Sequence, residues 1–384
     1  MELQLSEEQL MTRQAARDFA VNECLPGVIE RDELQKFPKE QVMQLADLGF
    51  MGMMVDSKYG GAGLDTVSYV LAIEEISKVD ASTSVCMSVN NSLVCWGIET
   101  YGSEEQKQKY LVPLAQGKKD GELYIGAFLL SEPEAGSDAT SQSTTAEDKG
   151  DHYLLNGIKN WITNGNTASA YLVMAQTEVS KGSRGINTFI VEKNWAGVSV
   201  GAKENKLGIR GSDTHSILFN DVKVPKENRI GEDGFGFKFA MQTLNGGRIG
   251  IASQALGIAS GAYERSIEYS KQRKAFGKPI KDHQIIQFKL ADMATRIEAA
   301  RLLCLNAAWE KDHHLDYTVS AAKAKVFASE TAMWAATEAV QIHGGYGYVK
   351  EYHVERMMRD AKITQIYEGT SEVQRMVISR SILK

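Results

Sequence analysis

The chain of 384 residues is 43% hydrophobic and 24% charged, a balance that excludes a largely disordered protein. Its formal net charge of −6 argues against a nucleic-acid-binding protein, which needs a basic surface. No stretch approaches about 18 consecutive apolar residues, so we expect no transmembrane helix.

The N-terminal part of the sequence is helical in pattern. Ser6 precedes two glutamates in the manner of a helix start, and apolar residues recur at helical spacing over residues 65–77 and 84–101. Ser103 followed three positions later by Gln106 resembles a capping box. We therefore predict an N-terminal helical domain over residues 1–120.

The pattern changes twice more along the chain. Residues 121–230 contain short β-rich runs separated by turn residues, which predicts a central β-domain, either β-barrel-like or a small sandwich. Residues 231–384 hold one proline, Pro279, and show helical periodicity. The predicted helices are residues 235–273, 283–311, 319–344 and 371–383. These predict a C-terminal four-helix bundle and an α+β fold overall.

The cysteines and the N-terminus indicate the compartment. The four cysteines, Cys24, Cys86, Cys95 and Cys304, form no CxxC pair, and the seven histidines show no metal-binding spacing, so we predict no metal site. Scattered cysteines of this kind are typical of buried thiols in a reducing compartment. The start of the sequence lacks the pattern of a signal or transit segment, and we expect a cytoplasmic protein with no membrane span.

Several common enzyme signatures are missing from the sequence. It contains no P-loop motif, no GxGxxG after a strand and no GxSxG elbow. The sequence therefore gives no support for a P-loop nucleotide-binding protein, a Rossmann dehydrogenase or an α/β-type serine hydrolase.

Two stretches of the β-region have the composition of a cofactor site. The turn from Phe128 to Asp138 is rich in small hydrogen-bonding groups that could bind a flat heterocycle or a phosphate, although an ordinary loop has the same composition. The segment Lys159–Gly165 places Trp161 before an Asn-Gly turn. Its indole could contact a planar cofactor or could be a core residue beside a hairpin.

Two stretches of the C-terminal region carry charge at unusual places. Residues 271–281 contain five cationic side chains, which suit an anionic phosphate or a solvated helix end. Residues 359–372 place Glu368 where two predicted helices meet. A desolvated carboxylate there could act as a base, or Glu368 could simply cap the next helix.

Together these stretches resemble the acyl-CoA dehydrogenase family, over essentially the whole chain. Residues 130–138 resemble one family signature, and residues 341–347 with 359–369 resemble the other. Residues 247–259 are most similar to the short-chain (butyryl-CoA) members. The resemblance implies an N-terminal helical domain, a central β-domain and a C-terminal four-helix domain, usually in homotetramers with one FAD per subunit, which a neighbouring subunit partly encloses.

The resemblance also implies site residues. Those expected to bind FAD are Phe128, Leu130, Ser131, Gly136, Ser137, Trp161, Ile162, Thr163, Arg273, Phe276, His283, Gln284, Gln341, Gly344, Gly345, Thr370 and Glu372. Those expected to contact the acyl-CoA are Ser137, Asn245, Arg248 and Gly369. Glu368 matches the catalytic base, which takes the α-proton of a short straight-chain acyl-CoA as hydride leaves its β-carbon for the flavin. The product would be a trans-2-enoyl-CoA, and the electrons would pass to an electron-transferring flavoprotein.

Three positions refine the expected substrate. Asn245 stands where straight-chain members usually have Asp, so the strength of the expected pantetheine contact is open. Gly247 stands where the isovaleryl-type and long-chain members carry their catalytic Glu, which favours Glu368 as the base here. Ser84 stands near the Arg of glutaryl-type members, which argues against a dicarboxylyl substrate.

Several other interpretations stay open at this point. The same site could run in the reductive direction, from crotonyl-CoA to butyryl-CoA, or could accept a medium or branched chain. A flavin oxidase on the same fold and a scaffold protein without activity are further alternatives. Flavin content and enoyl-CoA formation would separate these possibilities.

Overall fold

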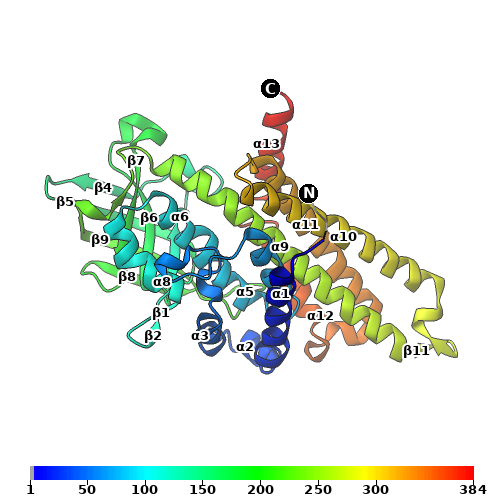
Figure 1. The fold of residues 1–384 in the computed structure, drawn as a ribbon. Coiled ribbons are helices and arrows are strands. Elements are labelled where there is room, and N and C mark those ends of the chain that lie inside the picture. The colour runs from blue at the N-terminus through cyan, green and yellow to red at the C-terminus, as the bar shows by residue number, and fades with distance from the viewer. Residues whose placement is uncertain (1–3) are drawn as a thin grey trace.

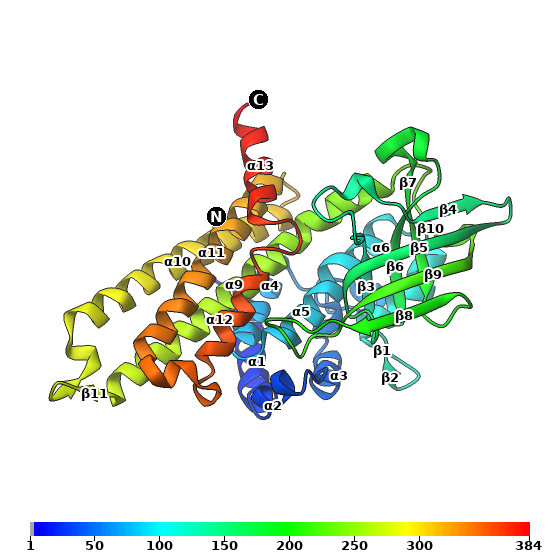
Figure 2. The same ribbon diagram turned by 180° about the vertical axis from the view of Figure 1, so that it is seen from behind.

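The computed structural model describes residues 4–384 and places a β-sheet between two sets of helices in chain order. In Figures 1 and 2 the sheet lies at one end of the molecule, and the longest helix runs from it to the opposite end. This α–β–α order confirms the predicted α+β fold class.

Eight α-helices make up the N-terminal part. They are α1 (Glu7–Phe19), α2 (Val28–Glu33), α3 (Lys39–Asp47), α4 (Thr66–Ser77), α5 (Ala81–Ser88), α6 (Trp96–Tyr101), α7 (Glu104–Gln106) and α8 (Val112–Gln116). Both predicted helix starts are confirmed: Ser6 and Ser103 each accept a hydrogen bond from the backbone N–H three residues on, at 3.2 Å, and a glutamine completes each capping box. Helix α4 is buried along its whole length, because other helices cover it on all sides.

The β-region is built mainly on one sheet of eight strands. The strands of the region are β1 (Lys118–Lys119), β2 (Glu122–Leu123), β3 (Gly126–Leu129), β4 (Thr145–Asp148), β5 (His152–Thr163), β6 (Ala170–Gln176), β7 (Ile186–Glu192), β8 (Val198–Lys203), β9 (Thr214–Pro225) and β10 (Arg229–Ile230). The sheet order is β10-β7-β6-β4-β5-β9-β8, with β3 paired in parallel to β6 and β1–β2 forming a separate hairpin. The turn after β3 contacts the end of β5 through the hydrogen bond from the backbone N–H of Asn160 to the carbonyl oxygen of Ser131, and candidate cofactor residues lie in both segments.

The C-terminal helices match the predicted ranges within one residue at each end. They are α9 (Gly236–Gln272), α10 (Gln284–Asp312), α11 (Thr318–His343) and α13 (Ser371–Ile382), and a short hairpin of β11 (Lys274–Ala275) and β12 (Lys278–Pro279) joins α9 to α10. Helix α12 (Val354–Ile363) was not predicted from the sequence. Its many charged residues leave only three buried apolar side chains, those of Val354, Met357 and Ala361, so its helical pattern is weak. Helix α9 packs against α4, α10 and α11.

The described residues contain neither a membrane-spanning helix nor a cluster of metal ligands. Over residues 4–384, no helix combines the length and the apolar character that crossing a membrane requires. No group of three or more His, Cys, Asp or Glu side chains in the same range is arranged to hold a metal ion. All four cysteines are buried with free thiols.

Glycines on α9 set how closely it approaches α4. A Cβ at Gly257 would lie 2.4 Å from the carbonyl oxygen of Glu74 and 2.5 Å from Cβ of Ser77. A Cβ at Gly261 would lie 2.4 Å from the carbonyl oxygen of Lys78. The two helices therefore pack backbone to backbone, which only glycine permits at these positions.

We expect Gly257→Ala to lower the free energy of unfolding by about 1–3 kcal/mol, because the added methyl group overpacks this contact. Denaturant unfolding of the purified variant measures the change. The matched control is Gly246→Ala on the same helix, where the nearest atom to the new Cβ lies at an ordinary 3.6 Å. That control should be as stable as the parent or more so, since glycine in a helix costs about 0.5–1 kcal/mol relative to alanine. Equal destabilisation by both variants would contradict the packing argument.

Candidate active site

Glu368 lies in the connection between α12 and α13. The N-cap of α13 is Thr370, whose Oγ1 accepts a hydrogen bond from the backbone N–H of Val373 at 3.3 Å. The interpretation of Glu368 as a helix cap is therefore wrong, and its side chain is free for another role.

The backbone at Glu368 is held in an uncommon conformation. Glu368 has φ 52° and Gly369 has φ 91°, so two successive residues lie in the left-handed region. The side-chain amide of Gln374 donates to the carbonyl oxygens of Glu368 and Gly369, at 3.2 and 2.8 Å, and Nζ of Lys325 donates to that of Gly369 at 2.7 Å. A conformation of this kind persists only where the surroundings enforce it, as these donors do here.

The carboxylate of Glu368 points at helix α9. A Cβ built on Gly247 would lie 2.1 Å from Oε2 of Glu368, so no other residue fits at position 247 while the carboxylate occupies this place. Oε2 is buried and has no hydrogen-bond partner among residues 4–384. A buried carboxylate oxygen without a protein donor is suited to receive a proton from a bound molecule.

Burial raises the pKa of Glu368 to about 7, while the nearby charges of Lys325 and Arg248 act in the opposite direction. Desolvation disfavours the charged form of a carboxyl group, which explains the direction. A carboxyl group that titrates near neutrality is matched to the work of a general base.

The candidate substrate-binding residues on α9, Asn245 and Arg248, lie on either side of Gly247, which the Glu368 carboxylate approaches. Nη1 of Arg248 donates to Oδ1 of Asn245 at 2.7 Å, and Nδ2 of Asn245 donates to Oγ1 of Thr318 at 3.1 Å. Asn245 therefore links α9 to the start of α11. Gly369 adjoins Glu368, and Ser137 is exposed in the turn after β3.

The candidate flavin residues of the β-region form one surface. The backbone N–H of Asn160 donates to the carbonyl oxygen of Ser131 at 2.8 Å, which joins the turn after β3 to the end of β5. Phe128 and Thr163 are half-buried, Leu130 and Ile162 are buried, and Gly136 is exposed. Trp161 has φ 63° and is 60% exposed. The interpretation of Trp161 as a core residue is therefore wrong, and its indole is available to a planar ring.

A buried ion pair supports that surface, and the sequence analysis assigned it no role. Lys159 is fully buried on β5, and its Nζ donates to Oε1 of Glu132 at 2.8 Å, to Oε1 of Gln142 at 3.0 Å and to the carbonyl oxygen of Leu130 at 3.0 Å. Glu132 in turn accepts from the backbone N–H groups of Ser143 and Thr144. The sequence signal was weak, because β5 also carries other polar residues, among them Asn156 and Asn160.

The second group of candidate cofactor residues surrounds an open cavity of about 450 Å³ at the far end of α9. Its lining includes Arg273, Gly344 and Gly345. Phe276 is 96% exposed, and its ring lies 6.0 Å from that of His283. Gln284, the first residue of α10, and Gln341, near the end of α11, are exposed. Thr370 and Glu372 instead lie beside Glu368, at the start of α13.

One chain does not bring these two groups together. The β-sheet and the β11 hairpin lie at opposite ends of the molecule, with α9 between them, in Figures 1 and 2. Helix α9 has 37 residues, which corresponds to about 55 Å. The surface around Trp161 and the cavity at Arg273 are thus separate surfaces of a single chain.

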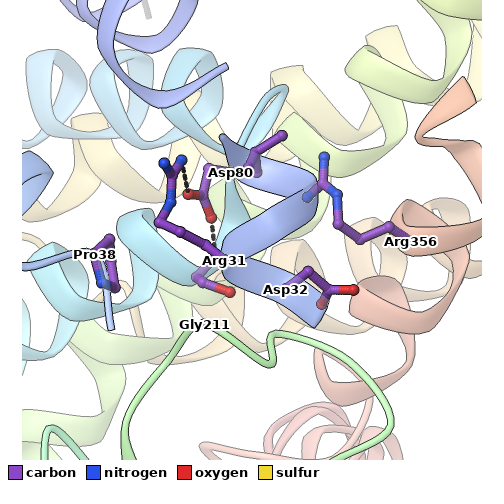
Figure 3. Close-up of a pocket in the computed structure, with 8 residues that line it drawn as sticks. Arg31, Asp32, Pro38, Asp80, Gly211 and Arg356 are labelled. Carbon is purple, nitrogen blue, oxygen red and sulfur yellow. Dashed lines mark hydrogen bonds and ion pairs between the residues drawn. The ribbon is translucent and has the colours of Figure 1, made fainter. Parts of the chain in front are cut away.

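A smaller cavity lies elsewhere, where α2 meets α12 and the loop at Gly211 (Figure 3). Arg31 pairs with Asp80 at 3.1 Å, and Arg356, which also lines the cavity, pairs with Asp360 at 3.2 Å. Its volume of about 10 Å³ admits no more than a water molecule. It is a packing feature between elements and not a substrate site.

Comparison with known proteins agrees with this geometry along the whole chain. Three family models match: the acyl-CoA dehydrogenase N-terminal domain at residues 6–118, the middle domain at 127–222 and the C-terminal domain at 234–383. The short-chain specific acyl-CoA dehydrogenase of Clostridium acetobutylicum is 51% identical over 384 residues, covering 100% of both chains.

Two solved structures are similar over 100% of both chains. Butyryl-CoA dehydrogenase from Megasphaera elsdenii matches with a TM-score of 0.97 at 50% identity. A chain solved in work on the electron transferring flavoprotein of Acidaminococcus fermentans and flavin-based electron bifurcation matches with a TM-score of 0.98 at 50% identity. Because the three family models together match most of the chain and a full-length relative is 51% identical, the chain belongs to the acyl-CoA dehydrogenase family.

Proposed function

We propose that this chain is an FAD-dependent dehydrogenase that converts a short straight-chain acyl-CoA to the trans-2-enoyl-CoA. The observation that carries the proposal is the buried carboxylate of Glu368, whose pKa is raised to about 7 and whose Oε2 has no protein partner in the described chain. Glu368 removes the α-proton of the thioester. The names of the relatives from C. acetobutylicum and M. elsdenii support a short acyl chain.

The residues of this chain fit FAD. The exposed indole of Trp161 beside the turn at Ser131 suits a flat ring, and the cavity at Arg273 suits a phosphate. Gly344 and Gly345 leave open space there, since a Cβ at either would meet no atom within 4 Å. FAD, when bound, supplies the acceptor for the hydride from the β-carbon and the route for electrons to an electron-transferring flavoprotein.

The fit also supports assembly from several subunits. The β-sheet that carries Trp161 and the β11 hairpin that follows Arg273 lie at opposite ends of one chain in Figure 1, so we expect a complete FAD site to need the Arg273 cavity of one subunit beside the Trp161 surface of another. Exposed apolar side chains near that cavity, Phe276, Ile285 and Phe288, suit burial in such an interface. A homotetramer with one FAD per chain is the arrangement we propose.

The surroundings of Glu368 support a short, uncharged acyl chain. Gly250 lies one turn along α9 from Gly247, and a Cβ there would lie 2.5 Å from the hydroxyl oxygen of Tyr69. The Tyr69 side chain is fully buried, and its hydroxyl is hydrogen-bonded to that of Ser88 at 2.8 Å. Tyr69 thus packs against α9 one turn from Gly247, which favours a short acyl chain. Ser84 is buried and donates to a carbonyl oxygen, so it offers no cation for a distal carboxylate. The four free thiols support a cytoplasmic location, which we also propose.

The decisive test is Glu368→Gln, which keeps the shape of the side chain but cannot accept the α-proton. We expect the variant to bind FAD and to reduce it with butyryl-CoA at least ~10²–10⁴-fold more slowly, the contribution of a general base. Stopped-flow loss of flavin absorbance in a single turnover measures the step. Glu351→Gln at an exposed position is the matched control. A near-parental rate in Glu368→Gln would show that another group is the base.

The pKa of Glu368 predicts how flavin reduction depends on pH. A base must be ionised to accept a proton, so the single-turnover rate should rise with pH and level off above about pH 7. The measurement is the rate of flavin reduction from about pH 5 to about pH 9, with the FAD content checked at each point. A rate that is constant across this range would contradict the assignment, and so would one that falls as pH rises.

Arg273→Ala tests the proposed phosphate contact. Because a hydrogen bond to a charged group contributes about 1.5–3 kcal/mol, FAD should dissociate about tenfold to a hundredfold more readily. Titration of apoprotein with FAD measures the affinity. Lys271→Ala is the control, since this neighbouring cation is exposed and pairs with Glu268 at 3.6 Å. Equal FAD affinities for Arg273→Ala and the parent would show that Arg273 does not contact a phosphate of FAD.

A further inference from the structure

Lys325 is a buried cation that the proposed chemistry leaves without a role. It lies on α11 with an exposed fraction of 0%, and no carboxylate within residues 4–384 forms an ion pair with it. Its ammonium donates one hydrogen bond in the described chain, to the carbonyl oxygen of Gly369 at 2.7 Å. Burying an ammonium group is costly unless something nearby compensates its charge.

The contact of Lys325 falls directly beside the candidate base. Gly369 follows Glu368, and both residues have left-handed backbone conformations, with φ 91° and 52°. Gln374 on α13 donates to the same carbonyl oxygen from a second helix, at 2.8 Å. The peptide after Glu368 is therefore fixed from α11 by a charged donor and from α13 by a neutral donor.

The negative charge that acts most strongly on the buried ammonium of Lys325 is the Glu368 carboxylate. The cations that act on the carboxylate are Lys325 from α11, with the larger effect, and Arg248 from α9. Tyr69 from α4 and Tyr367 complete the titratable groups that face it, and burial keeps both hydroxyls protonated by raising their pKa. Nη1 of Arg248 donates a hydrogen bond to Oδ1 of Asn245 at 2.7 Å. Burial lowers the pKa of Lys325 to about 8; Glu368 and Glu372 oppose that shift, and Arg248 adds to it.

We propose that Lys325 is a positioning residue for the base: its hydrogen bond to Gly369 orients Glu368, and its charge keeps the Glu368 carboxylate ionised and ready to accept the α-proton. This inference rests on the proposed function of Glu368. When the carboxylate takes the proton it becomes neutral, and Lys325 retains its own charge and its hydrogen bond. The ammonium therefore stabilises the ionised carboxylate that is present before proton transfer. In this way it lowers the pH above which Glu368 is ionised and can act as the base.

The experiment compares Lys325→Met with Gln374→Met in the FAD-loaded protein. Both variants lose a donor to Gly369, but only Lys325→Met loses a charge. We expect Lys325→Met to raise the apparent pKa of flavin reduction by about one unit or more, the usual effect of removing a nearby opposite charge. At about pH 6 this equals a rate about tenfold lower. Gln374→Met should lower the rate and leave the pH profile in place.

Two further measurements keep the test independent of turnover and of folding. The infrared carboxyl band of Glu368, identified by its loss in Glu368→Gln, should titrate at higher pH in Lys325→Met without any substrate. Lys325→Arg should keep the parental pH profile because it keeps the charge, and FAD content and melting temperature report whether each variant folds.

The outcomes separate this inference from the proposed function. If Glu368→Gln reduces its flavin normally, the proposed function fails. If Glu368→Gln is inactive but Lys325→Met keeps the parental pH profile and carboxyl titration, only the role of Lys325 is overturned. A shift of equal size in Lys325→Arg or in Gln374→Met would also overturn it, because charge would then not be the cause.

Discussion

The close packing of α9 against its neighbours is the constraint on which the rest of the structure depends. Gly257 and Gly261 bring its backbone onto α4, and Gly247 leaves room for the Glu368 carboxylate. The same helix begins against β7, where a Cβ at Gly236 would lie 2.4 Å from Asn187, and ends at the cavity of Arg273. A single rigid helix thus sets the distance between the β-sheet, the base and the distal cavity.

Buried lysines hold the two loops that carry the family signatures. Lys159 donates to the carbonyl oxygen of Leu130 in the turn after β3, and Lys325 donates to that of Gly369 beside the base. Lys159 has Glu132 as an ion-pair partner, which holds the pKa of that carboxyl at about 2. Lys325 forms no ion pair among the described residues, and Oε2 of Glu368 accepts no hydrogen bond there. The ion pair of Lys159 suits a fixed cofactor surface, whereas the unpaired carboxylate of Glu368 stays able to accept a proton.

In a single chain the candidate cofactor residues lie on two separate surfaces. Trp161 on β5 and Phe276 in the β11–β12 hairpin are large aromatic residues with exposed fractions of 60% and 96%, and the sheet and the hairpin lie at opposite ends of the molecule in Figure 2. Covering these two large apolar side chains would remove apolar surface from water and so would stabilise an assembly. Both are accounted for if neighbouring subunits complete the proposed FAD site.

The sequence by itself determined the order of helices and strands, the ends of α9, α10, α11 and α13, and the candidate base. Periodicity, capping residues and scarce prolines are local signals, and the motif around Glu368 is continuous in the chain. Only the tertiary structure decided that Gly247 meets Glu368, that Trp161 is exposed, and that Lys325 contacts Gly369. These contacts join residues 44 or more positions apart or depend on what covers a side chain, and no local pattern encodes either.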